Sequence, residues 1–104
     1  MKDYFVSVYQ VLKAIEESSY NNSFDYDETL NLEKLNLKES ELMVIIENII
    51  DDKLVKGLLI IPGMSGFKAA NPRLTTNGYS YLKDNSEMKR AYNFLKEVKG
   101  WIPG

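Results

Sequence analysis

Five cationic side chains, which flank a predicted hairpin or lie on the predicted last helix, have the charge needed to contact phosphate groups. They are Lys56, Lys68, Arg73, Lys89 and Arg90. Contacts of this kind neutralise a nucleic-acid backbone, so they give affinity that falls with salt and depends little on base sequence. The competing interpretation is a solvated face of ordinary solubility lysines, and for the last helix taken alone that interpretation is preferred.

Other chemistries are restricted by the residues that the sequence lacks. The chain has no cysteine and no histidine, which removes disulfides, zinc–thiolate sites and the commonest general base. Gly57, Gly63 and Gly66 do not fit a phosphate-binding loop such as GxxxxGKS or GxGxxG. Carboxylates alone can catalyse reactions, but they need a pocket that perturbs their pKa values. We therefore expect a protein that is not an enzyme and that has no metal or other cofactor.

Length and composition bound the architecture that must position these side chains. The 104 residues, of which 44 % are hydrophobic and 27 % charged, predict one domain spanning residues 1–104. The start of the sequence lacks the basic region and apolar block of a signal peptide, and the longest apolar run is too short to cross a bilayer. We expect a cytoplasmic protein that makes no membrane contact.

Hydrophobic periodicity predicts three long helices. They cover residues 3–19, 39–52 and 87–99. The second of them is expected to begin after Lys38 at the N-cap, with Glu41 at the capping-box position. The third is expected to be capped by Ser86 and to be followed by an apolar tail that contains Trp101.

Shorter segments connect these helices. They are predicted to be a strand at Glu28–Leu30, a helical turn at Leu32–Leu35, strands at 54–61 and 69–74, and a helix capped by Thr75 that runs through Leu82. In that last helix we expect Tyr79 and Leu82 to face the core. Asn77-Gly78 leaves an alternative open, because Asn-Gly between apolar residues is also the strongest two-residue hairpin signal.

The order of the last predicted elements is typical of the wing of a winged-helix domain. It consists of a strand, a tip around Pro62-Gly63, a return strand and a capped helix. The predicted fold class is therefore α+β and mostly α. Specifically, the sequence predicts a winged helix-turn-helix with a β-hairpin wing and an added C-terminal helix and tail at residues 86–104. A fold of this class does not by itself define a function.

One family shares the order of several short motifs. The motifs are Leu54-Val55-Lys56-Gly57, Leu74-Thr75 with Gly78 and Tyr81-Leu82, Asn85-Ser86, Met88-Lys89-Arg90-Ala91, Leu95-Lys96-Glu97 and Trp101-Ile102. In this order the chain resembles the YjcQ-like proteins of Firmicute bacteria and their phages, from about Leu35 onward and loosely in the first helix. The resemblance implies a winged-helix fold and a phage or prophage origin. Lys53 departs from the glycine that winged helices often have where the helix ends in a left-handed residue.

Charge is distributed unevenly along the chain. Residues 1–52 contain four lysines and twelve acidic residues, a net charge of −8, whereas residues 53–104 contain nine Lys and Arg and three acidic residues, a net charge of +6. This asymmetry suits an anionic partner for the basic half or head-to-tail self-association. The alternative is that the two halves pack together and mix their charges on one surface.

The helix at 39–52 would be the recognition helix of a winged helix, yet its exposed face is predicted to be acidic. That face includes Val44, Glu47, Asn48 and Asp51 and no Lys or Arg. Acidic side chains repel phosphates, and one asparagine is a weak reader of adenine. Sequence-specific readout by this helix is therefore not expected.

Two functions remain in view. The first is contact with the backbone of duplex DNA through the five cations, with a homodimer as an open alternative to a monomer. The second is a protein–protein interaction through Val44, Glu47 and Asp51, or through the Trp101 tail, whose other interpretation is packing onto its own domain.

Overall fold

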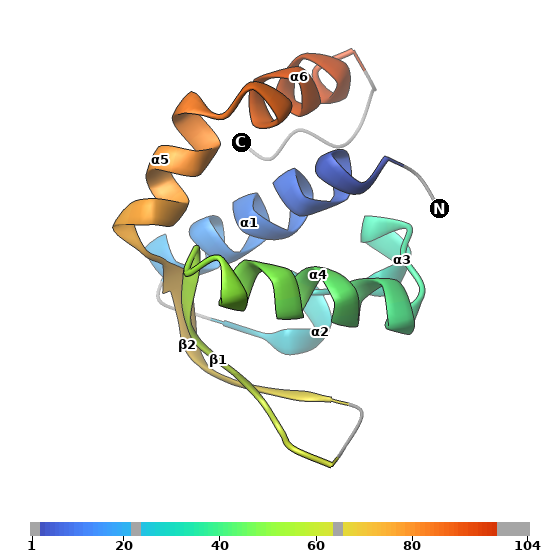
Figure 1. Ribbon diagram of the computed structural model, residues 1–104. Coiled ribbons are helices and arrows are strands. Elements are labelled where there is room, and N and C mark those ends of the chain that lie inside the picture. Colours follow the sequence, from blue (N-terminus) through green and yellow to red (C-terminus); the bar gives the residue numbers. More distant parts are fainter. Residues whose placement is uncertain (1–2, 22–23, 64–65, 98–104) are drawn as a thin grey trace.

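The helix α1 (Tyr4–Tyr20) runs through the middle of the fold, between α6 on one side and α4 on the other (Figure 1). The computed structural model describes residues 3–21, 24–63 and 66–97. Asp3 begins α1 as its N-cap, because its carboxylate accepts hydrogen bonds from the backbone N–H groups of Phe5 and Val6 at 2.9 and 3.1 Å. The helix predicted at residues 3–19 is confirmed.

Two short helices follow, and one of them replaces a predicted strand. Residues Tyr26–Thr29 form α2, so the strand expected at Glu28–Leu30 is wrong. The reason is local, since the Asp25 carboxylate accepts from the N–H groups of Asp27 and Glu28 and so starts a helical turn. The helical turn expected at Leu32–Leu35 is confirmed as α3 (Leu32–Leu35).

The helix α4 (Glu39–Asp51) has the predicted bounds within one residue. Its stripe of Leu42, Ile45, Ile46 and Ile49 is buried. Lys38 occupies the N-cap, and its backbone N–H donates to the Glu41 carboxylate at 2.9 Å, as the capping-box position predicts.

After α4 the chain turns through Lys53, whose φ of +58° is left-handed. Backbone hydrogen bonds from Lys53 to Ile50 and from Leu54 to Ile49 close the end of the helix. Lys53 therefore occupies the position where a glycine would be free of strain, as the sequence predicts.

The strands β1 (Val55–Ile60) and β2 (Phe67–Leu74) form an antiparallel hairpin, which confirms the two strands expected here. The far end of the hairpin extends away from the long helices (Figure 1). On its inner face the ring of Phe67 lies 5.5 Å from the ring of Tyr26 in α2. The protein is thus mostly helical with one two-stranded sheet, in agreement with an α+β class.

The helix α5 (Thr76–Asp84) contains the Asn77-Gly78 pair, so the helix prediction is confirmed and the hairpin alternative at this point is wrong. Thr75 is the N-cap, and its hydroxyl accepts from the N–H of Gly78 at 3.0 Å. Leu82 packs against the core, but the prediction for Tyr79 is wrong because 38 % of that side chain is exposed.

The helix α6 (Ser86–Leu95) packs on α1 through Met88, Ala91 and Leu95. Its N-cap is Asn85, whose side-chain oxygen accepts hydrogen bonds from the N–H groups of Glu87 and Met88. The cap expected at Ser86 is therefore displaced by one residue. The helix ends at Leu95, four residues before the predicted end. No helix in the described ranges combines the length and apolar character needed to cross a membrane.

Candidate nucleic-acid interface

Three of the five predicted cations lie on one face of the β1–β2 hairpin. Lys56 is the cross-strand partner of Arg73, and Lys68 is the partner of Leu59. Val55 and Leu58 point into the core while their neighbours Lys56 and Leu59 are exposed. Because paired residues of an antiparallel ladder project from the same face, Lys56, Leu59, Lys68 and Arg73 together form what we call the hairpin outer face.

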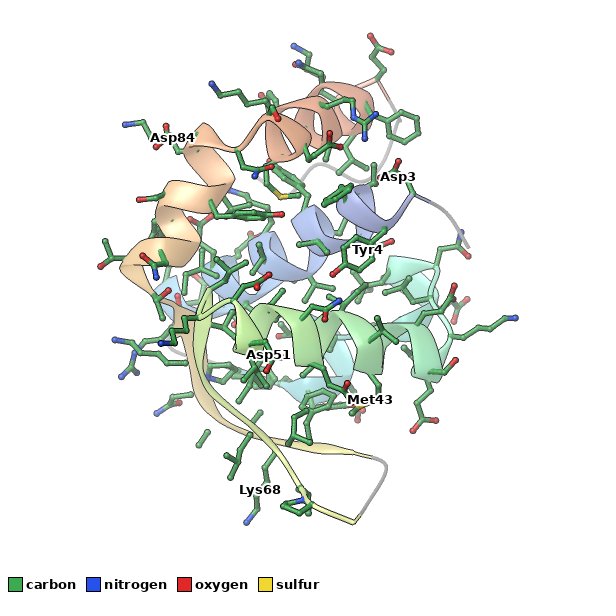
Figure 2. All side chains as sticks on the ribbon, in the orientation of Figure 1. Asp3, Tyr4, Met43, Asp51, Lys68 and Asp84 are labelled. Atoms are coloured by element: carbon green, nitrogen blue, oxygen red, sulfur yellow. The ribbon has the colours of Figure 1, made fainter. Side chains whose placement is uncertain are left out.

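Within the part of the chain that the structure describes, these three charges are not compensated by ion pairs. Among the described residues, Lys56, Lys68 and Arg73 form no ion pair, and neither strand contains an acidic residue. Lys68 projects from the hairpin away from the helices (Figure 2). The three charges are therefore open to an anionic partner.

An irregularity in the ladder positions this face. Between the pairs Lys56–Arg73 and Leu58–Ala69, the single residue Gly57 lies opposite three residues of β2. Gly57 has φ of +85°, and a Cβ atom there would lie 2.6 Å from the carbonyl oxygen of Ala70. A side chain would thus be strained in its backbone and would also collide with the other strand, so the bulge requires glycine.

The other two predicted cations lie elsewhere. Lys89 and Arg90 are on α6, which packs on the opposite side of α1 from the extended end of the hairpin (Figure 1). Arg90 forms ion pairs with Glu87 and, at 3.8 Å, with Asp3 at the start of α1. The charge of Arg90 is therefore partly compensated. Because α6 and the extended end of the hairpin lie on opposite sides of α1, the five cations do not form one surface.

The exposed face of α4 is as acidic as the sequence predicts. Val44 is 50 % exposed, and Glu47 and Asp51 are exposed on the same helix. Asn48, the residue of this face that could recognise adenine, donates a hydrogen bond from Nδ2 to the Tyr4 hydroxyl at 2.7 Å. Figure 2 shows Tyr4 between α1 and α4, where its hydroxyl accepts this hydrogen bond. Trp101, the fourth residue predicted for protein contact, lies outside the described residues.

Sequence reasoning missed a small cavity between α1 and α6. It has a volume of about 210 Å³ and is lined by Asp3, Val6, Glu87, Arg90, Ala91 and Phe94. Asp3 could have been found as an N-cap from its position before the apolar stripe of α1. Its approach to Arg90 has no local sequence signal, because the two residues lie near opposite ends of the sequence.

The shifted pKa values belong to four tyrosines and to Lys13. Burial alone would lower the pKa of Lys13, but the hydrogen bond with Glu16 and the nearby negative charge outweigh it and raise this pKa. The hydrogen bond with Tyr79 is the main cause that raises the pKa of Tyr20 to about 12. Burial raises the pKa values of Tyr9, Tyr26 and Tyr81. Within the described ranges no group of three acidic side chains is arranged to hold a metal ion.

Fold and site together define a small, mostly helical protein with a basic hairpin and an acidic helix. Residues 9–101 match the family model described as YjcQ protein, and the chain therefore belongs to the YjcQ family. The family resemblance predicted from the sequence is confirmed.

Among curated proteins, the chain is similar to a Bacillus subtilis (strain 168) protein described as "Uncharacterized protein YjcQ". The two are 48 % identical over 31 residues, which is 30 % of this chain and 33 % of that relative. No solved structure matches the chain.

Proposed function

We propose that this protein is a winged-helix protein that binds duplex DNA through the phosphate backbone, with the hairpin outer face as its contact surface. The observation that carries the proposal is the juxtaposition of Lys56, Lys68 and Arg73 on one exposed face, where none of them forms an ion pair with a described residue. The order of α1, α3, α4 and the hairpin supports the winged-helix assignment.

The mode of binding follows from what α4 presents. A winged helix that reads sequence places cationic or amide side chains of its recognition helix against base edges. On α4 the exposed charges at Glu47 and Asp51 are negative, and Asn48 is engaged by Tyr4. The protein therefore binds with the hairpin toward the duplex and α4 away from it, and it discriminates little between sequences.

A salt titration of duplex binding tests this proposal. For the variant Lys68→Ala/Arg73→Ala we expect weaker binding to every duplex and a slope of log K against log salt that is smaller by about 1.8, the change for two phosphate contacts. The matched control is Lys34→Ala/Lys83→Ala, which removes the same charge from exposed lysines outside the hairpin. Equal affinity of the hairpin variant and the wild type would refute the proposal.

A protein partner at α4 is the second candidate, and the exposure of Val44 within the acidic face favours it. A basic protein surface would complement Glu47 and Asp51 and cover the valine. This function would be supported if the wild type captures a host protein and the variant Glu47→Lys does not. The control variant Glu17→Lys, on α1, should still capture it. Trp101→Ala tests the tail in the same assay, and light scattering tests a homodimer. The phage or prophage origin stays a prediction of the family resemblance.

A further inference from the structure

One apolar side chain lies within the hairpin outer face and remains open to solvent. Leu59 is 65 % exposed, lies opposite Lys68 and is three residues from Lys56 on the same strand. A single exposed leucine is ordinary on a protein surface. Leu59 differs because its direct cross-strand partner is Lys68, whose aliphatic stem could cover it, and yet most of the leucine stays uncovered.

The backbone holds Leu59 in a fixed relation to the cations. Lys68 lies directly opposite, and Lys56 and Arg73 form the next outer pair about 10 Å further along the ladder, at roughly 3.3 Å per residue. The pairing register and the Gly57 bulge fix these positions. A partner that covers this face must therefore offer negative charge beside an apolar region.

The minor groove of DNA has this chemistry, since phosphates line both rims of a narrow floor of sugars and base edges. From this match we infer that Leu59 enters the minor groove as an apolar wedge while Lys56, Lys68 and Arg73 contact the phosphates at its rims. This inference rests on the proposed function and adds a groove and a binding mode to it. An acidic protein surface with an exposed apolar residue, such as α4 with Val44, offers the same chemistry but is a convex helix, whereas the minor groove is a groove that the hairpin can enter.

Insertion of the wedge has a mechanical consequence. The minor groove is about 6 Å wide, so a two-stranded ribbon that presses a leucine into it must open the groove. Apolar side chains inserted in this way partly unstack a base step and bend the duplex toward the major groove. Pyrimidine–purine steps such as TA unstack most easily, so the protein should prefer a site with a flexible step although it reads no base by hydrogen bonding.

Fluorescence energy transfer between dyes at the two ends of a short duplex with a central TA step measures this bending. The full-length wild type is compared with Leu59→Ala, with Leu59→Lys, and with Val44→Ala as a control. Val44 is also an exposed aliphatic residue, but it lies on acidic α4. Because Leu59 and Val44 are both exposed, none of the substitutions removes core packing, and a thermal melt of each variant checks that it is folded.

We expect the wild type and Val44→Ala to bend the duplex and Leu59→Ala to bind the TA duplex about tenfold more weakly without bending it. Leu59→Lys separates charge from shape, because it should bind at least as tightly at low salt and still fail to bend the duplex. Two outcomes would overturn the wedge and leave the proposed function standing. In both, the wild type binds in a salt-sensitive way, but either it does not bend the duplex or Leu59→Ala bends the duplex equally. Absence of salt-sensitive binding by the wild type would overturn both.

Discussion

Replacement of Gly78 by alanine gives the sharpest test of how α5 is joined to the hairpin. Gly78 lies in the first turn of a helix, where intrinsic propensity alone predicts that alanine stabilises by about 1 kcal/mol. The structure predicts the opposite sign. A Cβ atom on Gly78 would lie 2.1 Å from the carbonyl oxygen of Leu54 and 3.2 Å from the Cβ of Leu74.

The size of the effect follows from what must move. To relieve a contact of 2.1 Å with a backbone oxygen, α5 must shift by about 1 Å, and overpacking of this kind costs about 1–3 kcal/mol. The shift also strains two hydrogen bonds at Thr75, from its N–H to the Leu54 oxygen at 3.0 Å and from its hydroxyl to the Lys53 oxygen at 2.6 Å. Each bond contributes about 1 kcal/mol. After subtraction of the propensity gain, we expect Gly78→Ala to destabilise by about 3 kcal/mol.

Urea denaturation followed by far-ultraviolet circular dichroism measures this difference. The control is Ser80→Ala, an exposed position of the same helix, which should be neutral or stabilise by a few tenths of a kcal/mol. A lower midpoint at unchanged m would show a loss of stability without a change in the unfolded state. A Gly78→Ala protein as stable as the wild type would refute the close packing of α5 on the start of β1.

Three further substitutions have defined outcomes. Lys53→Gly should stabilise by about 1 kcal/mol in the same denaturation assay, because φ of +58° strains a side chain, and an unchanged midpoint would contradict that strain. Asp3→Ala should destabilise the protein by about 1 kcal/mol because the α1 cap is lost. Asp3→Asn keeps a hydrogen-bond acceptor and loses only the exposed ion pair with Arg90, so it should destabilise by a few tenths of a kcal/mol. The pKa of Tyr20 is raised from 10.0 to about 12, so the folded state retains this proton more strongly, and the resulting stabilisation is complete below pH 10 and lost as the pH rises to 12. Tyr20→Phe should flatten the stability curve in that window, and equal curves for both proteins would argue against the Tyr79 hydrogen bond.

The long helices could be predicted from sequence because each has an apolar stripe of several turns. In α4 the spacing of Leu42, Ile45, Ile46 and Ile49 identified the buried face, and the same spacing showed that Glu47 and Asp51 would be exposed. The hairpin strands were predictable for a similar reason, since β-rich segments flank Pro62-Gly63. In both cases, a repeated local pattern was strong enough to set the structure.

Segments of only a few residues were less predictable, because a single hydrogen bond decides between competing structures. Asp25 turns an alternating segment into α2 by capping it. Asn85 takes the N-cap that Ser86 was expected to fill, one residue later. Tyr79 was assigned to the core from helical spacing, yet α5 is short and its inner side faces Leu54 through Gly78. Non-local contacts, such as that of Asn48 with Tyr4, have no sequence signal at all.

The charge asymmetry of the sequence becomes a spatial separation at the hairpin but not at α6. On α6 the basic half of the chain packs against α1 of the acidic half, and Arg90 meets Asp3, so charges of opposite sign mix there. On the hairpin they do not mix, because the strands contain three cations and no acid and extend away from the long helices (Figure 1). A net charge of −2 is therefore a poor guide to binding. Within about 10 Å, the range over which charges act at 0.1 M salt, an approaching polyanion would be attracted by the hairpin and repelled by α4. The two elements would thus orient the protein before any contact forms.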